Sequence, residues 1–176
     1  MIRGKKRWVQ VAIVLVIVAG TWWYSNPIRL SQRAQLEGVT VRVPFGWVVQ
    51  NIPSQKQSVP VLGLRRAYVP WTRSWASVGI SYSGLGRPNT MESSRRAQVW
   101  TAAEYSDKTH YSNQRTFDVT SGKYPSLCAG GTMHGNGKTS GAQFLTCYIV
   151  GTPLMAIFRS SKDVDGDAER ILNSLN

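Results

Sequence analysis

The apolar stretch near the N-terminus constrains the fold of this chain more than any other feature. Residues 9–20 are apolar except for Gln10. Basic residues precede this stretch and aromatic residues stand at both of its ends, namely Arg3, Lys5, Lys6, Arg7, Trp8, Trp22, Trp23 and Tyr24. Basic residues stay on the cytoplasmic side of membrane helices, and Trp and Tyr are enriched at both interfaces. The pattern predicts one transmembrane helix over residues 8–24, at the short end of the length that spans a bilayer.

This interpretation predicts the location of the chain as well as its organisation. Residues 1–7 would form a cytoplasmic basic tip, residues 25–36 a polar tether, and residues 37–176 one extracytoplasmic, periplasmic domain at the inner or plasma membrane. The alternative is a cleaved signal peptide, whose cleavage site needs small residues. Bulky aromatic residues follow the apolar stretch instead. The sequence therefore favours a retained single-pass anchor.

Alternating apolar and polar residues predict a sheet in the exported part of the chain. The predicted strands cover residues 39–43, 47–50, 59–69, 76–82, 115–119, 126–134, 143–150 and 154–159. One helix is expected from a cap at Asn89, with Glu92 completing a capping box, to about Tyr105. A last helix is expected from Asp163 or Asp165 to the end of the chain. This order predicts an α+β fold, an α-β-α sandwich with a central antiparallel sheet preceded by the transmembrane helix.

Cys128 and Cys147 are the only cysteines. A two-residue hairpin turn at Gly137-Lys138 places these cysteines directly opposite each other, whereas a turn centred on Asn136-Gly137 misaligns them. In the first register a disulfide across the hairpin is geometrically reasonable, and an exported domain meets an oxidising compartment in many organisms. The sequence favours this disulfide over two buried free thiols.

The net charge of +12 is unevenly distributed along the chain. Ten basic and two acidic residues lie between Arg29 and Arg96, whereas seven of each follow from Glu104 onward. A basic surface can attract a polyanion such as lipid headgroups or an envelope polymer. The scattered positions favour the alternative, a solvated surface that keeps the domain soluble. A functional contact surface would draw on Arg65, Arg66, Arg73, Arg87, Arg95 and Arg96.

The sequence predicts no catalytic, cofactor-binding or metal-binding residues. Gly137-Lys138-Thr139 resembles the end of a phosphate-binding loop, but Thr132 stands where that loop needs glycine. The acidic run at 163–169 has the glycine too early for a calcium loop, and acidic residues at a helix N-terminus are stabilised by the helix dipole. His110 and His134 are the only histidines. A serine hydrolase using one of them stays as a minor hypothesis.

The two ends of the predicted domain carry recognisable motifs. The opening is VPFGW at 43–47, where a strand leads into Pro, one residue and Gly-Trp. The ending has a strand with MAIF at 155–158, an acidic turn, and a helix with AERILNSL at 168–175. Together these ends resemble the Mog1/PsbP-like family. The resemblance implies an α-β-α sandwich whose members mostly bind proteins, and it implies no catalytic residues.

Two functional hypotheses lead from these observations. The first is a non-enzymatic, membrane-tethered interaction domain that binds an envelope protein or an anionic envelope polymer. The second is an accessory subunit of a membrane complex, held mainly by its transmembrane helix. No cofactor is expected, and the predicted location argues against a nucleic-acid partner.

Overall fold

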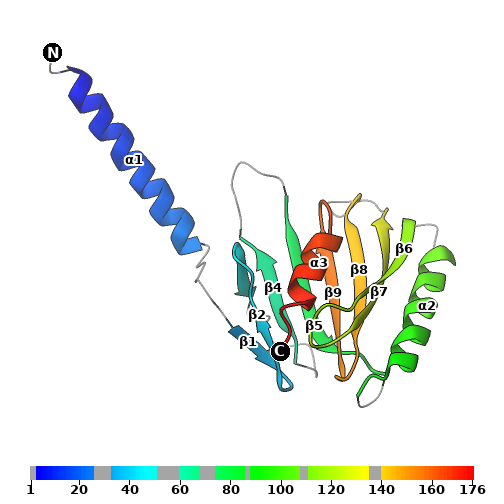
Figure 1. Cartoon of the computed structure of the whole chain (residues 1–176). Helices are drawn as coiled ribbons and strands as arrows, with labels where there is room; N and C mark the ends of the chain where they lie inside the picture. The colour runs from blue at the N-terminus through cyan, green and yellow to red at the C-terminus, as the bar shows by residue number, and fades with distance from the viewer. Residues whose placement is uncertain are drawn as a thin grey trace.

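A seven-stranded antiparallel sheet forms the centre of the computed structural model (Figure 1), which describes residues 3–25, 33–50, 60–67, 74–85, 88–107, 111–134 and 140–176. The strand order is β3-β4-β5-β9-β8-β7-β6. The strands are β3 Trp47–Gln50, β4 Leu62–Arg66, β5 Ala76–Tyr82, β6 Tyr111–Val119, β7 Ser126–Met133, β8 Gln143–Ile149 and β9 Leu154–Ser160.

A second, two-stranded sheet consists of β1 (Arg33–Leu36) and β2 (Val39–Arg42). These strands are joined by Glu37 and Gly38, whose φ angles are 50° and 79°. Positive φ at both central residues is the requirement of a tight type I′ turn, whose twist matches that of the flanking strands. Because the turn has two residues, it sets the register of the whole hairpin.

Three helices accompany the two sheets in the described residues: α1 Arg3–Ser25, α2 Met91–Asp107 and α3 Asp165–Leu172. Helix α1 extends away from the sheet (Figure 1), and Trp22 near its C-terminal end packs against Val48 and Ala67. Its apolar side chains from Trp8 to Val18 are exposed.

The two faces of the central sheet are covered by different elements. On β8, Leu145 and Cys147 belong to a large apolar core shared with α3 and the β1–β2 hairpin. Thr146 and Tyr148 point to the opposite face, because successive strand residues alternate. There the hydroxyl of Tyr148 bonds that of Thr101 on α2 at 2.8 Å. Helix α2 packs on β6, β7 and β8 and so covers one half of its face.

The predicted transmembrane helix over 8–24 is wrong. In the part of the chain that the structure describes, no helix is long and apolar enough to cross a membrane. The apolar stretch of residues 9–20 rises by roughly 18 Å as a helix, which is well short of a hydrocarbon core of about 30 Å. The predicted single-pass anchor and the periplasmic location at an inner membrane lose their basis with this helix. The accessory-subunit hypothesis assumed this helix as its anchor, and as a function it stays a prediction.

The predicted α-β-α sandwich is also corrected. The protein is mostly β, with nine strands in two sheets among the described residues. The β1–β2 hairpin and the eight-residue helix α3 cover one face in place of a layer of helices. The hairpin was not expected, because β1 lies in the segment 25–36 interpreted as a tether. Apolar burial of Ala34 overrides the polar composition of that segment.

Two helix ends differ from the sequence-based expectation. Asn89 does not cap α2, because its side-chain amide is buried and donates to the carbonyls of Ile149 and Leu154. The cap is formed by Thr90 and Ser93, which exchange hydrogen bonds between side chain and backbone at 2.9 and 3.0 Å. The last helix does not reach the end of the chain, since α3 ends at Leu172.

The predicted disulfide is confirmed. Cys128 on β7 stands directly opposite Cys147 on β8, and the two sulfur atoms are bonded at 2.05 Å. The same register pairs Thr132 with Gln143 toward the hairpin end. The turn at Gly137-Lys138 that motivated the prediction lies outside the described residues. Both cysteines are fully buried in the main core.

Candidate anion-binding site

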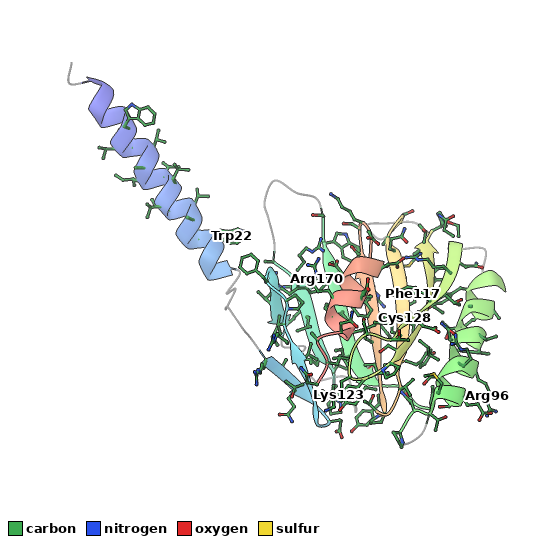
Figure 2. The ribbon with its side chains drawn as sticks, in the orientation of Figure 1. Trp22, Arg96, Phe117, Lys123, Cys128 and Arg170 are labelled. Atoms are coloured by element: carbon green, nitrogen blue, oxygen red, sulfur yellow. A yellow bond between two sulfur atoms is a disulfide. The ribbon has the colours of Figure 1, made fainter. Side chains whose placement is uncertain are left out.

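The described arginines of the predicted contact surface do not share one face. Arg66 on β4 contacts Asp167 on α3 at 2.6 Å, on the face of the main core. Arg95 and Arg96 lie on α2, where Arg95 bonds Asp118 at 2.7 Å and Arg96 bonds Glu92 at 2.5 Å. In Figure 2, Arg96 lies at the opposite end of the sheet from β4. The other three members are Arg65, which is described on β4, and Arg73 and Arg87, which lie outside the described residues.

A different set of arginines converges beside the β1–β2 hairpin. Arg33, Arg42 and Arg170 line a hollow of about 510 Å³ together with Val43, Pro44, Phe45 and Ser174. Figure 2 shows Arg170 on α3, on the side of the molecule that faces β1 and β2. No acidic side chain of a described residue lines this hollow. We call this set the arginine pocket.

The hairpin register brings the first two arginines together. Arg33 on β1 stands directly opposite Arg42 on β2. Both are exposed, because each is followed or preceded along its strand by a buried residue, Ala34 or Val41. Like charges placed directly opposite each other across a strand pair destabilise it. The hairpin therefore holds two positive charges where packing alone would favour another pair.

The C-terminal segment brings in the third arginine. Beyond α3 the chain pairs with β2, through two backbone hydrogen bonds of 2.7 and 2.9 Å between Thr40 and Asn176. Leu175 is buried there beside Val41, to which it is joined by a bridge. This pairing holds Arg170 and Ser174 at the border of the pocket.

Phe45 forms part of the rim for a conformational reason. It occupies the second position of the turn from Pro44 to Trp47, which is closed by a 3.1 Å hydrogen bond from the Trp47 amide to the Pro44 carbonyl. Gly46 follows with a φ of 84°, as a type II turn requires at its third position. Trp47 is buried, whereas Phe45 is 78% exposed. The turn therefore presents an aromatic ring beside three guanidinium groups.

The arginines of the pocket differ in their partners from four other described arginines. Within the described part of the chain, Arg33, Arg42 and Arg170 form no ion pair, whereas Arg66, Arg95, Arg96 and Arg115 each pair with an acidic residue. A second hollow of about 280 Å³ adjoins the first, and it is lined by Arg33, Arg42, Thr40 and Asn176. The two hollows share the same arginine pair.

The sequence analysis did not identify this pocket. Its residues are spread over 33–45 and 170–176, and Arg33 was assigned to a tether. The available signal was Glu37-Gly38 between two short segments with alternating apolar residues, which is a typical hairpin pattern. That signal predicts the Arg33–Arg42 pair. It does not predict Arg170, because only the docking of the C-terminal segment brings α3 close.

The acidic run at 163–169 has structural partners in place of a metal. Arg66 bonds Asp167, and Arg115 bonds Asp165 at 2.5 and 2.8 Å. Asp163 accepts a hydrogen bond from the Asp165 amide at 3.0 Å, near the start of α3. Among the residues searched, no group of three or more His, Cys, Asp or Glu side chains could hold a metal ion.

One serine and one histidine do meet at the edge of the sheet. The Ser112 hydroxyl and the His134 Nε2 atom are 2.5 Å apart. No carboxylate of a described residue bonds His134, and neither residue lines one of the hollows described above. The arrangement therefore lacks the third group that orients a catalytic histidine. His110 lies outside the described residues.

No protein-family model matches this sequence, and a search of curated proteins finds no match.

Proposed function

We propose that this protein is a non-enzymatic interaction domain that binds an anionic polymer through the arginine pocket. The observation that carries the proposal is the convergence of Arg33, Arg42 and Arg170 on one hollow that has no acidic lining. A guanidinium group presents N–H donors in a planar fork that matches carboxylate and phosphate oxygens. Three such groups around one hollow favour a ligand with several negative charges.

The energetic cost of the Arg33–Arg42 pair supports a binding role. The two residues are exposed, and their direct opposition is unfavourable without a counter-charge. An anion placed between them converts this repulsion into two attractive contacts. A solvated surface has no need for this register, since scattered lysines would keep a domain soluble equally well.

The two adjoining hollows favour a polymer over a single small anion. They share Arg33 and Arg42 and measure about 510 and 280 Å³. A chain of repeating anionic units can occupy both hollows and so contact the arginines from each of them. Exposed Phe45 adds an apolar surface on which the backbone of such a polymer can rest.

The resemblance to Mog1/PsbP-like domains accords with a binding role, because it implies a family whose members mostly bind proteins, and it implies no catalytic residues. We propose this relationship only as an expectation from the sequence of residues 43–47 and 155–175. An acidic protein is the second class of partner that this resemblance favours, and the experiment below includes it as an outcome.

The test is binding of fluorescent polyphosphate, polygalacturonate and poly-L-glutamate to the full chain at low and high salt. We expect at least one polymer to bind at low salt and to lose affinity at high salt, since exposed charges are screened over about 10 Å at 0.1 M. The pocket variant is Arg33→Gln/Arg42→Gln/Arg170→Gln. It should bind at least about tenfold more weakly, since hydrogen bonds to charged groups are strong.

A matched control separates the pocket from the overall charge. The variant Arg96→Gln/Lys123→Gln/Lys162→Gln removes the same number of positive charges, three, but from exposed positions outside the pocket. It should bind nearly as well as the original chain. Equal weakening in both variants would show a diffuse charge effect and overturn the proposal. Binding of poly-L-glutamate alone would shift the partner class to an acidic protein.

The hydrolase hypothesis has one observation in its favour, the Ser112–His134 hydrogen bond. It requires that the chain cleave a general ester substrate such as p-nitrophenyl acetate above the background rate. It also requires that Ser112→Ala and His134→Ala each abolish that activity. Activity that survives both substitutions rules out this pair as the catalytic machinery.

A further inference from the structure

A third hollow, separate from the two beside the β1–β2 hairpin, lies on the far side of the central sheet from the main core. It measures about 310 Å³, and its lining comes from four neighbouring strands and from Val61, which directly precedes β4. Gly79 on β5 pairs with Ile157 on β9, and Ile157 pairs with Thr146 on β8. Thr146 bonds Tyr105 of α2 at 3.0 Å. The hollow therefore shares a face with α2, on the half of the sheet away from β6 and β7.

The polar side chains of this hollow follow from strand alternation. Val78 and Ile80 point into the main core, so Ser77, Gly79 and Ser81 point to the other face. Two other strands of the same sheet add polar side chains, Gln50 from β3 and Arg159 from β9. A hydroxylated ligand would meet hydrogen-bonding groups on several sides.

The floor of the hollow is bare backbone. Gly63 on β4 stands directly opposite Gly79 on β5, so neither strand contributes a side chain there. A Cβ atom built on Gly79 would lie 3.7 Å from the Val61 Cγ1 atom, which is an ordinary contact. The glycine is therefore not required by packing. Its absence of a side chain keeps the hollow open above β5, so a ring can lie against the half-buried peptide groups at Gly79, whereas Gly63 beside it is buried.

A row of basic and hydroxyl groups borders this floor. Ser77 stands between Arg65 on one neighbouring strand and Arg159 on the other. Neighbouring strands are about 4.8 Å apart, so the two arginines flank the serine within reach of one small anion. The guanidinium carbon of Arg159 lies 5.8 Å from the centre of the Phe144 ring, which borders the row on β8. In the part of the chain that the structure describes, no acidic residue lines the hollow.

We propose that this hollow is a second binding site, for a small hydroxylated ring that carries one carboxylate or phosphate group. The ring lies on the Gly63–Gly79 floor, with its hydroxyl groups bonded to Ser77, Ser81 and Gln50. Its anionic group bonds Arg159. The hollow is too small for a polymer segment with several units, so this site differs from the arginine pocket in the size of its ligand. The inference does not depend on the proposed function of that pocket.

The test is titration of the full chain with D-glucuronate, D-glucose 6-phosphate and D-glucose, followed by calorimetry and by NMR shifts. We expect one of the two anionic sugars to bind at least about tenfold more tightly than glucose, because the neutral sugar leaves Arg159 without its anion. The stronger of the two identifies carboxylate or phosphate as the preferred group. Failure of both anionic sugars to bind at millimolar concentrations would overturn the proposal.

Two variants locate the binding. Arg159→Gln should weaken binding of the anionic sugar at least about tenfold and leave the affinity for glucose unchanged. Gly79→Val should weaken binding of every sugar, because the valine side chain fills the floor of the hollow. If Gly79→Val fails to fold, as judged by urea unfolding, Arg159→Gln alone decides. The control is Lys123→Gln, an exposed residue that lines neither this hollow nor the arginine pocket and should leave sugar binding unchanged. Loss of sugar binding in that control, or its retention in Arg159→Gln, would place the sugar elsewhere.

Discussion

Two cross-strand pairs in this molecule have the same geometry and opposite energetics. Cys128 and Cys147 stand directly opposite each other on β7 and β8, fully buried and joined by a disulfide. Arg33 and Arg42 stand directly opposite each other on β1 and β2, exposed and equally charged. The first pair stabilises the fold covalently, whereas the second opposes it by repulsion.

The comparison distinguishes residues that stabilise the fold from residues that the fold positions for binding. A similar division runs through the arginines. Arg66 has a partner within the chain and ties two elements together, while those of the arginine pocket have none among the described residues. Charge density along the sequence does not make this distinction, because Arg66 of the first kind and Arg33 and Arg42 of the second all lie in the basic first half. Four predictions test it, in decreasing order of expected effect.

Reduction of the disulfide should have the largest effect on stability. The bond closes a loop with a sequence separation of 19, which corresponds to about 3 kcal/mol from restriction of the unfolded chain. We expect the urea midpoint to fall on addition of reductant, with a larger m-value because the reduced unfolded chain is less compact. The variant Cys128→Ala/Cys147→Ala should show no response to reductant. An unchanged midpoint for the reduced original chain would contradict the assigned role.

Removal of Arg66 should be the next largest change. Its guanidinium bonds both oxygens of Asp167 at 2.6 Å, and Asp167 is only 5% exposed. Arg66→Met leaves that carboxylate without its charged partner at a cost of about 2 kcal/mol. The matched control is Arg96→Met, whose partner Glu92 is exposed, and it should change stability by less than about 0.5 kcal/mol. Similar urea midpoints for both variants would show that burial does not separate the two pairs.

Relief of the arginine pair should act in the opposite direction. Arg33→Gln removes a like charge opposite Arg42 and should raise the free energy of unfolding by about 0.5 kcal/mol. The gain should shrink as salt is added, because the repulsion between exposed charges is screened. Urea unfolding at low and high salt measures both effects. A loss of stability in Arg33→Gln would mean that the pair is structural, and would weaken the comparison with the disulfide.

The smallest predicted effect concerns acid stability. Hydrogen bonds from the Arg95 guanidinium lower the pKa of Asp118 below its ordinary value of 3.8, against the opposing effect of partial burial. Because the folded pKa is the lower one, this contribution is present above about pH 3.8 and is lost as the pH falls through the folded pKa. The difference in free energy of unfolding between the Asp118→Asn variant and the original chain should therefore shrink as the pH falls from about 6 to about 2. A constant difference over that range would show that Asp118 does not titrate with folding.

Local pattern was sufficient for most strands of the central sheet. Alternation over 76–82 predicted β5, and the hairpin register predicted the pairing of Cys128 with Cys147. These inferences succeed because strand periodicity and turn length act over a few residues. The same reasoning failed for α1 and β1. In α1 the flanking residues resembled a membrane signal although the apolar stretch is short, and in β1 a polar composition concealed one buried residue, Ala34.

The candidate sites were beyond reach of local pattern because each depends on segments that are distant in sequence. Sequence by itself determined the strands of the central sheet, the excess of arginine in the first half and the two cysteines that could meet. Only the tertiary structure decided which arginines face an acid and which face open space, because that choice follows from the docking of α3 and the C-terminal segment against β2. Burial of Leu175 and Ile171 drives this docking, and apolar burial is non-directional. It therefore brings Arg170 beside Arg42 without any signal in the residues around either.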